Sequence, residues 1–524
     1  MEDEKRRIDR MDRISSLPQP LLQHIMSYLP FKQVVQTSVL STVWRQAWLT
    51  FPVLEFDEFR MGVKIRPYWE QILQIRRRNM VGVRKITLKT FSRTGDSEWA
   101  DRCASYAIEN NVQDLALEVN QIQSVWHNQR FQSVRYSLPP IVLCSKSIDV
   151  LKLGGCKLEL PRSDLKLSLR KLCLQNVYAD DQVINNVFLG CGLIEDLEVN
   201  LCQGFKSLKL LGLAKLRNIR LEDNDELEQL EIDALNANSV LSVSGTTPYI
   251  LDICKNLTSL YLSNSSFITD EWLCSNISRL PLLEKLFICQ CSNVEHMKIS
   301  SCHLKYLDIY DCRKLVEVAI ETPNLSIFRY TGDVISFSSG AAMTLSEAHL
   351  CFFTNKIRNF IRPSKNIQWY VKYIKLLSMF RQSQVVNLQS DCLEHWHFPR
   401  ELRQILTPPF SGVKHFKFGA GLLLSFNYPL ARVVDSLLWI SPHAETICLQ
   451  HLPHGKFCFQ FSYKQPPVYE RCCKSLHFLS CWEHCIEKVD IEITSVWRSS
   501  YVKRCVVEGK NIWEKIDSLA VSGP

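Results

Sequence analysis

The 524-residue sequence lacks a segment that could cross a membrane or direct secretion. Its best apolar candidate, residues 421–440, contains Asn427, Pro429, Arg432 and Asp435, which the core of a bilayer would not accept. The chain begins MEDEKRRIDRMDR, a stretch charged throughout and without the apolar core of a signal peptide. We therefore expect an intracellular protein, in the nucleus or the cytoplasm, with no membrane partner.

A strong charge imbalance is also missing. The net charge is only +8, and a content of 46% hydrophobic and 22% charged residues is typical of a globular protein. So small a charge does not argue for nucleic acid, because nucleic-acid-binding domains usually concentrate basic residues on one face. We expect no nucleic-acid partner.

The sequence contains no glycine-rich phosphate loop, no nucleophile elbow and no H-E-x-x-H pair. Neighbouring carboxylates such as Asp180 and Asp181, or Asp223 and Asp225, fall in expected turns and are interpreted as solvated turn residues. A cysteine–histidine nucleophile needs no sequence neighbours, but 21 cysteines and 13 histidines make chance pairs plentiful. We predict a protein that is not an enzyme and needs no cofactor.

The 21 cysteines, in a chain without a secretory signal, are expected to be mostly free thiols in a reducing compartment. Two regions invite a zinc hypothesis, which we disfavour because the first has no second ligand pair nearby and the second contains adjacent cysteines. These regions hold Cys392, His395 and His397, and then Cys472, Cys473, Cys481, His484 and Cys485. We predict packing thiols and no metal.

Residues 12–57 carry a dense apolar pattern with helical spacing. Ser15 and Ser16 can cap a first helix, whose apolar stripe contains Leu21, Leu22, Ile25 and Leu29, and Pro30 ends it. A second helix is expected from near Lys32, and a third from Ser41 with Trp44 and Trp48 on one face. Three helices this short cannot bury all these side chains among themselves. The module is therefore either a cap for the following structure or a partner-binding module.

This segment resembles the plant F-box throughout. The resemblance rests on DRIS-x-LP-x-x-LL-x-x-I-x-x-x-LP-x-K, then TS-x-LS-x-x-WR-x-x-W and L-x-FD, with one departure at Val43, where a basic residue is usual. It implies binding to a Skp-family adaptor and, through it, to a cullin. The residues that match the docking surface and its support are Leu17, Pro18, Leu21, Leu22, Ile25, Leu29, Pro30, Leu40, Trp44 and Trp48.

A frame L-x-x-L-x-L, with other large apolar residues allowed, recurs through the rest of the chain and predicts a leucine-rich repeat. The turn after the strand often carries Asn or Cys, as at Cys156, Cys202, Asn224, Cys291 and Cys312. The copies begin at Val83, Val112, Ile148, Leu169, Ile194, Leu216, Leu227, Leu257, Leu283, Leu304, Leu315, Leu325, Val413, Ala444 and Ile486.

The intervals between copies are uneven. Those near 21 to 30 residues fit a strand with a helix or loop return, and those of 10 or 11 fit strands joined by minimal returns. We expect an irregular solenoid whose parallel sheet forms the concave, recognising side. Variable positions there include Tyr261, Phe287, Asp308 and Tyr310, although most such positions merely solvate the sheet, so the substrate-binding site stays unknown.

The region after the repeats resembles the FBD region of plant F-box proteins. The matching elements are Leu437-Leu438, Ser441-Pro442, Glu445-Thr446, Leu449, Cys481-Trp482, Cys485, Lys488-Val489 and Ile491.

The expected α/β chain therefore has a small three-helix F-box and an irregular leucine-rich-repeat solenoid with a curved parallel sheet. Its predicted parts are the F-box at 8–57, repeats at 80–340, an irregular continuation with a helical insert at 341–434, an FBD-like region at 435–495 and a tail at 496–524. The resemblance implies a Skp–cullin–F-box (SCF) ubiquitin-ligase adaptor that binds an unknown protein substrate. The alternatives are a repeat scaffold or a small-molecule receptor that directs no degradation.

Overall fold

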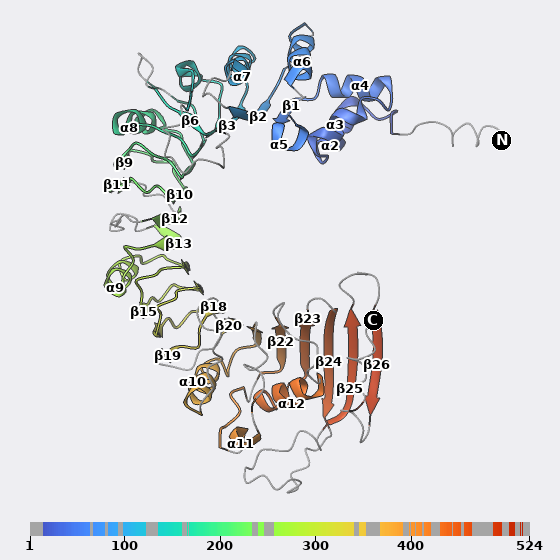
Figure 1. The fold of residues 1–524 in the computed structure, drawn as a ribbon, viewed down its shortest axis with the longest axis vertical. Coiled ribbons are helices and arrows are strands. Elements are labelled where there is room, and N and C mark those ends of the chain that lie inside the picture. Colours follow the sequence, from blue (N-terminus) through green and yellow to red (C-terminus); the bar gives the residue numbers. More distant parts are fainter. Residues whose placement is uncertain are drawn as a thin grey trace, which may run out of the picture. The chain divides into compact units, whose positions relative to one another are not determined.

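The fold was obtained as a computed structural model. It describes residues 14–62, 66–78, 82–92, 98–121, 135–159, 165, 167–232, 239–245, 256–339, 345–352, 367–390, 398, 400–403, 405–410, 413–420, 430–442, 444–451, 455–463, 486–494, 502–508, 514 and 516. The chain forms two compact units (Figure 1). Unit 1 contains residues 1–239 and 247–254, and unit 2 contains residues 240–246 and 255–524.

The N-terminal module consists of helices α2 (Gln19–Ser27), α3 (Phe31–Thr37) and α4 (Thr42–Leu49). Pro18 and Pro30 directly precede α2 and α3, where a missing N–H costs nothing. The Ser41 hydroxyl caps α4 by accepting from the Trp44 N–H at 3.3 Å. The predicted three-helix module is confirmed.

The main sheet of unit 1 is parallel and begins within the predicted F-box. Strand β1 (Val53–Asp57), predicted only as the end of that module, pairs with β2, so the repeat sheet starts there. The sheet order is β1, β2 (Lys85–Ser92), β3 (Asp114–Gln121), β5 (Val150–Gly154), β7 (Lys171–Gln175), β8 (Asp196–Asn200) and β10 (Asn218–Glu222).

Unit 2 contains a second parallel run, which continues across the boundaries predicted at 341 and 435. Its order is β13 (Leu257–Ser265), β14 (Lys285–Cys289), β16 (Tyr306–Tyr310), β18 (Ile327–Gly332), β20 (Glu347–Phe352), β21 (Val385–Ser390), β22 (His415–Ala420) and β23 (Thr446–His451). Three antiparallel strands follow: β24 (Gly455–Tyr463), β25 (Ile486–Thr494) and β26 (Val502–Glu508). The last lies in the predicted tail.

A second row of short strands accounts for the intervals of 10 or 11 residues. Strand β17 (Glu317–Glu321) does not pair with β16 or β18 but with β15 (His296–Ser300) and β19 (Ser336–Ser339). In unit 1, β11 (Gln229–Ile232) pairs with β9 (Ser207–Leu210), and β6 (Cys156–Lys157) pairs with β4 (Tyr136–Ser137). Strands that are 10 or 11 residues apart therefore belong alternately to the main sheet and to a separate short sheet. This corrects the expectation that such strands are neighbours joined by minimal returns.

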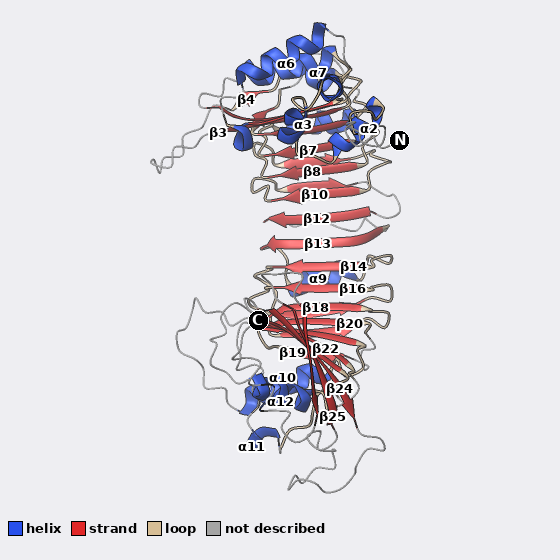
Figure 2. Ribbon diagram, turned by 90° about the vertical axis from the view of Figure 1, so that its right-hand side faces the viewer, coloured by secondary structure: helices blue, strands red, loops and turns tan. Residues whose placement is uncertain are grey.

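Helices occupy some of the returns (Figures 1 and 2). Helix α8 (Asp181–Gly190) packs on β9, and α9 (Asp270–Ile277) packs on β15. The helical insert predicted within residues 341–434 is confirmed as α10 (Ile367–Ser378). The remaining elements are α5 (Glu58–Met61), α6 (Arg66–Arg78), α7 (Glu98–Glu109), a 3₁₀ turn (Pro140–Cys144), β12 (Ser239–Gly245), α11 (Arg400–Arg403) and α12 (Leu430–Ile440).

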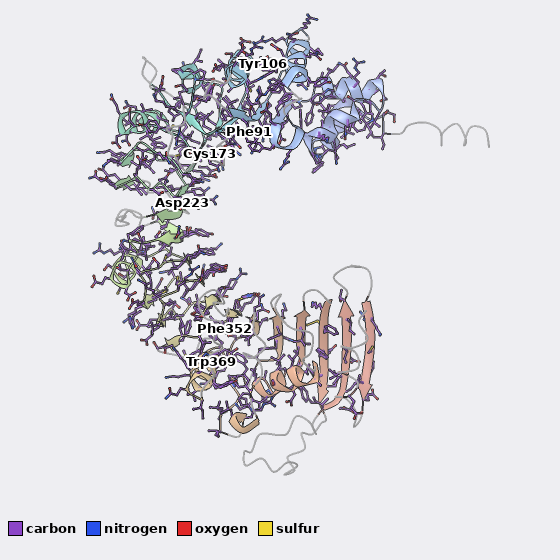
Figure 3. All side chains as sticks on the ribbon, viewed as in Figure 1. Phe91, Tyr106, Cys173, Asp223, Phe352 and Trp369 are labelled. Atoms are coloured by element: carbon purple, nitrogen blue, oxygen red, sulfur yellow. A yellow bond between two sulfur atoms is a disulfide. The ribbon has the colours of Figure 1, made fainter. Side chains whose placement is uncertain are left out.

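A left-handed residue follows many main-sheet strands and turns the chain inward. Asn176, Leu201, Asp223, Gln290 and Asp311 all have φ between 48° and 55° (Asp223 is labelled in Figure 3). Gly155 plays this part after β5, where an added Cβ would lie 2.2 Å from the Val119 carbonyl oxygen.

The predicted turn cysteines and asparagine come next and are buried, as packing residues should be: Cys156, Cys202, Asn224, Cys291 and Cys312. Asn224 donates to the Val199 carbonyl at 2.8 Å and accepts from the Cys202 N–H at 2.9 Å.

Most described cysteines are free thiols, as expected, with one exception. Cys448 and Cys458 face each other in register on β23 and β24 and form a disulfide. Among the described residues, no helix is long and apolar enough to cross a bilayer.

Candidate docking and recognition surfaces

Helix α2 has one face inside the protein and one exposed. Leu22 and Met26, four residues apart, are fully buried. Leu21, Ile25 and Tyr28 form a neighbouring stripe with exposed fractions of 49%, 37% and 76%. A helix places residues three and four apart on one side, so this second stripe is available to a partner.

More apolar side chains are exposed after α3 and in the first turn of α4. Val39 is 83% exposed, Leu40 63% and Val43 41%. The hydroxyl groups of Ser15 and Ser41 lie 3.0 Å apart, which brings the start of the module close to this turn. Large exposed apolar groups within one small module are typical of an interaction surface.

The structure divides the ten sequence-predicted docking residues. Leu17 and Leu29 are half-buried, whereas Pro18, Leu21, Ile25, Pro30 and Leu40 are exposed. Leu22, Trp44 and Trp48 are at most 6% exposed. These three therefore pack inside the chain and can support the docking surface from within, whereas helical spacing alone did not show which face is turned inward.

Sequence reasoning missed Tyr28 and Val39 as candidate contacts. The signal for Tyr28 was present, because it continues the Leu21–Ile25 spacing. Val39 lies beyond the end of α3, where helical periodicity no longer applies.

Trp48 belongs to an aromatic core that joins the module to the first repeat. Its ring lies 5.4 Å from that of Phe31, which lies 5.5 Å from that of Phe56 on β1. Arg76 of α6 is buried and donates to the carbonyls of Phe51 at 2.7 Å and Trp48 at 2.9 Å. Burial lowers the pKa of Arg76 to about 10, which leaves it charged at neutral pH.

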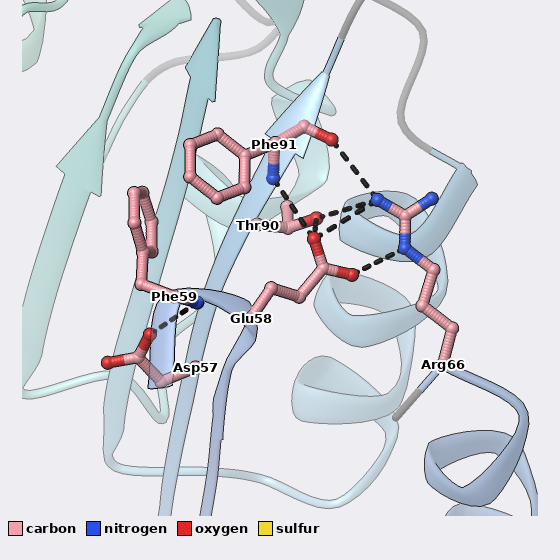
Figure 4. A network of polar contacts seen from close by, with 6 residues as sticks. All are labelled: Asp57, Glu58, Phe59, Arg66, Thr90 and Phe91. Carbon is pink, nitrogen blue, oxygen red and sulfur yellow. Dashed lines mark hydrogen bonds and ion pairs between the residues drawn. The ribbon is translucent and has the colours of Figure 1, made fainter. Parts of the chain in front are cut away.

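A buried carboxylate fixes the chain where it leaves β1 (Figure 4). Glu58 accepts from the Thr90 hydroxyl at 2.8 Å, the Phe91 N–H at 3.2 Å and Arg66 Nη2 at 3.1 Å. Burial alone would raise the pKa of Glu58, but these hydrogen bonds outweigh it and lower the pKa. Asp57 beside it caps α5 by accepting from the Phe59 N–H at 2.9 Å. The helical module and the first repeats therefore form one packed body.

The main sheet of unit 2 has an open face, defined by the side chains that alternate with the buried ones. One row across it contains Tyr261, Phe287, Asp308, Arg329, His349, Asn387 and Lys417. The structure brings together three of the four candidate positions from the sequence, Tyr261, Phe287 and Asp308. Tyr310 lies two residues further along β16 and is 45% exposed.

Aromatic rings cover the β13–β16 part of this face. The rings of Tyr261 and Phe287 stack 4.0 Å apart at 8°, and Tyr306 lies 4.8 Å from Phe287. The Tyr306 hydroxyl donates to Asp308 at 3.2 Å, and the Arg329 guanidinium lies 5.5 Å from the centre of the Tyr306 ring. Beyond them, His349 bridges Glu347 at 2.8 Å and Asn387 at 2.9 Å.

The corresponding face of unit 1 is charged and self-paired. Lysines on one strand meet carboxylates on the next, with distances of 3.4 Å for Lys85–Asp114, 2.8 Å for Lys89–Glu118 and 2.9 Å for Lys171–Glu198. Such ladders satisfy their own charges.

No cluster of three or more potential metal ligands occurs in the part of the chain that the structure describes. Both groups of residues considered for zinc, Cys392 with its two histidines and the Cys472–Cys485 group, lie outside the described residues.

Comparisons with known proteins match both parts of this arrangement. The F-box domain model matches residues 14–56. The model of the At1g61320/AtMIF1 LRR domain matches residues 73–250 and 243–398, which together cover more than half of the chain.

Curated relatives from Arabidopsis thaliana combine the same two parts. The putative F-box/LRR-repeat protein At3g18150 is 26% identical over 344 residues, 62% of this chain and 68% of the relative. The F-box/LRR-repeat protein At5g02910 is 24% identical over 385 residues, 67% of this chain and 77% of the relative. The FBD-associated F-box protein At3g52670 is 28% identical over 190 residues, 36% of this chain and 43% of the relative. The chain belongs to the plant F-box/leucine-rich-repeat proteins.

Proposed function

We propose that this protein is the substrate-recognition adaptor of an SCF ubiquitin ligase. Its F-box binds a Skp-family adaptor, and its repeats bind a target protein. The observation that carries the proposal is the exposed apolar stripe of Leu21, Ile25 and Tyr28 on the F-box module. The F-box match supports the identity of the partner.

The adaptor acts by proximity and does no bond chemistry itself. A target held beside a charged ubiquitin carrier meets it at a high effective concentration, which speeds transfer to a target lysine. The packing of Trp48, Arg76 and Glu58 supports this role, because a rigid connection keeps the docking surface in a fixed position relative to the first repeats.

Co-purification with a Skp-family adaptor tests the proposal. The double variant Leu21→Asp/Ile25→Asp places charges on the exposed stripe without touching the core, and it should lose the Skp protein. Leu189→Asp is the matched control, since Leu189 of α8 is 73% exposed and lies outside the F-box. Equal recovery of the Skp protein by the double variant and the control would contradict the docking proposal.

Ubiquitin transfer separates an adaptor from a scaffold or a small-molecule receptor that directs no degradation. Deleting residues 1–57 is a poor test, because it removes β1 and the ring partners of the aromatic core. The same double variant is preferable: an adaptor needs the stripe for transfer to a bound target, whereas a scaffold does not.

The C-terminal segment and the location of the protein belong to this proposal as well. We propose that residues 435–495 form an FBD-like region, supported by the match of Leu437, Leu438 and Val489 to its pattern and by the FBD-associated relative. All three of these side chains are fully buried, as pattern-defining apolar residues should be. An adaptor of this kind acts inside the cell, in the nucleus or the cytoplasm.

A further inference from the structure

We propose that Cys448 and Cys458 form a reversible redox site on the open face of unit 2, which glutathione oxidises and reduces by thiol–disulfide exchange. The pair changes between a cross-link and two thiols as the redox state of its surroundings changes. This inference rests on the proposed function for one point, the location of the chain inside the cell, where disulfides are usually transient or redox-sensing.

The antiparallel ladder holds the two sulfur atoms together. Cys448 on β23 faces Cys458 on β24 directly, and six register pairs join these strands. The two Cα atoms lie 4.1 Å apart, the close spacing typical of facing residues that exchange no backbone hydrogen bonds. The backbone pairing does not depend on the cross-link. The sheet therefore keeps both thiols in place after reduction, and this proximity lets the bond form again.

The arrangement of this pair is not repeated at the free cysteines of the described strands. None of them faces another cysteine across a strand pair; Cys289, for example, lies in register between Ser263 and Tyr310. Cys291 and Cys312 are close neighbours, but they lie in turns, are buried and remain free thiols. Facing positions on antiparallel strands therefore distinguish the proposed site.

The pair is also accessible to a small thiol. Cys448 and Cys458 are half-buried on the open face, in the row that contains Lys417. Free cysteines inside the coils differ, because burial raises the pKa of Cys156 and of Cys191 to about 12. Thiols with so high a pKa stay protonated and unreactive at neutral pH. Exchange is therefore favoured at the pair over the buried thiols.

The charges beside the pair differ between its two sulfur atoms. Lys417, which is exposed and forms no ion pair with a described residue, is in register with Cys448 on the neighbouring strand. Cys458 is in register with Glu492, whose carboxylate accepts from Arg504 Nε at 3.1 Å. A neighbouring cation stabilises a thiolate, so Cys448 is the better leaving group.

The exchange conserves atoms and electrons. A glutathione thiolate attacks the Cys458 sulfur, the bond between the two cysteines breaks, and Cys448 leaves as a thiolate. A second glutathione thiolate attacks the glutathione sulfur of the mixed disulfide, and Cys458 leaves. Two glutathione molecules become one glutathione disulfide, and the protein thiolates take up the two protons. The reverse sequence, driven by glutathione disulfide, restores the cross-link.

Peptide mapping of the purified full chain in glutathione buffers tests the proposal. The buffers range from reduced to oxidised glutathione, free thiols are trapped by alkylation, and trypsin then cuts after Arg432, Lys456 and Lys464. This digestion places Cys448 and Cys458 in two peptides with a single cysteine each. We expect the two peptides linked in oxidised buffer, and separate and alkylated in reduced buffer, while the chain stays folded.

Cys291 and Cys312 provide an internal control, because these buried neighbours should remain free thiols in every buffer. A link between Cys448 and Cys458 that never forms in oxidised glutathione would overturn the proposal. A link that resists reduced glutathione until the chain is unfolded would also overturn it. The same holds if Cys291 and Cys312 become linked under the same conditions, because the facing positions would then confer no selectivity.

Two variants test the individual roles. Lys417→Gln should slow reduction by glutathione roughly twofold or more, because the departing Cys448 thiolate loses its neighbouring charge. Lys414→Gln is the matched control, since Lys414 is exposed and already paired with Glu445 at 2.7 Å. Equal rates in the two variants would overturn the assignment of Cys448 as the leaving group. Cys448→Ser should abolish the linked peptides and leave Cys458 to form a mixed disulfide with glutathione.

The two proposals fail separately. Loss of the Skp adaptor by the Leu21/Ile25 variant bears on the proposed function alone. The dependence of the linked peptides on glutathione bears on this inference alone, because it is measured on the chain without the adaptor.

Discussion

Arg76 holds the end of the last F-box helix through Trp48. Its guanidinium lies 5.2 Å from the centre of the Trp48 indole, and its Nη2 donates to the Trp48 carbonyl at 2.9 Å. One side chain of α6 thus satisfies a helix-terminal carbonyl and covers a core ring, although 28 residues separate the two partners. The F-box and the first repeat depend on each other for their packing.

Replacing Arg76 should therefore loosen the F-box. Arg76→Met removes the guanidinium donor of the Phe51 carbonyl and leaves the Trp48 carbonyl with the Phe51 N–H alone, at a cost of about 1 to 3 kcal/mol in local stability. Hydrogen exchange of residues 42–57 should accelerate by at least about tenfold. Arg77→Met is the control, because the Arg77–Glu109 pair is exposed and contributes little. Equal exchange in the two variants would show that Arg76 does not connect the parts.

Glu58 should make this junction sensitive to acid. A folded-state pKa below that of the unfolded chain, about 4.3, stabilises the fold at neutral pH, and this contribution is lost as the pH falls through the folded value. Glu58→Gln should destabilise the junction at pH 7 by about 1 to 3 kcal/mol, with a deficit that shrinks below about pH 4. Urea midpoints measured from pH 7 to pH 3 test this. A deficit that stays constant with pH would contradict the ionised state of Glu58. Glu228→Gln is the control, because Glu228 belongs to an exposed ion pair that contributes little to stability.

Asn224 should stabilise two coils of unit 1. Asn224→Ala leaves the buried Cys202 N–H without its acceptor and removes the amide donor from the Val199 carbonyl, at a cost of about 1 to 3 kcal/mol. The exposed Asn218→Ala should be nearly neutral. Hydrogen exchange at Cys202 and its neighbours provides the measurement, and an unchanged rate in Asn224→Ala would contradict the role of this side chain.

Leu201 is a position where a substitution should stabilise the fold. It has a φ of 55°, which is unfavourable for leucine, and its side chain is 48% exposed. Asparagine occupies the equivalent place at Asn176, so Leu201→Asn should raise the stability by about 1 kcal/mol. Leu211→Asn, at another exposed leucine, should not raise it. A lower denaturation midpoint for Leu201→Asn would contradict this account of the turn.

The sequence predicted the repeats well because their signal is local. Each of the fifteen frames contains a strand of the structure, since alternating apolar residues specify a half-buried strand wherever they occur. Strands β20 and β21 were missed although Ala348, Leu350, Val386 and Leu388 follow the same alternation. In β20 the small Ala348 occupies the second apolar position of the frame, and the frame of β21 would begin with Ser383, so neither fitted a template of large apolar residues.

The pairing of strands could not be predicted in the same way. Whether β17 joins β16 or β15 depends on how the coil closes, a property of contacts distant in sequence. The inward position of Trp48 has the same kind of cause, because Arg76 and Phe56 decide which face of α4 is covered. The apolar face of α2 was predicted from the sequence. The sequence did not show which of its residues face the core and which face a partner.

The affinity for a Skp-family adaptor tests the central claim most directly. Isothermal titration of the full chain should show that Ile25→Ala weakens binding by about tenfold or more, as expected for an apolar contact inside an interface. Leu189→Ala, truncated at an exposed site on α8, should bind like the unmodified chain. Equal affinities for Ile25→Ala and the unmodified chain would contradict the claim that the exposed face of α2 is the docking surface.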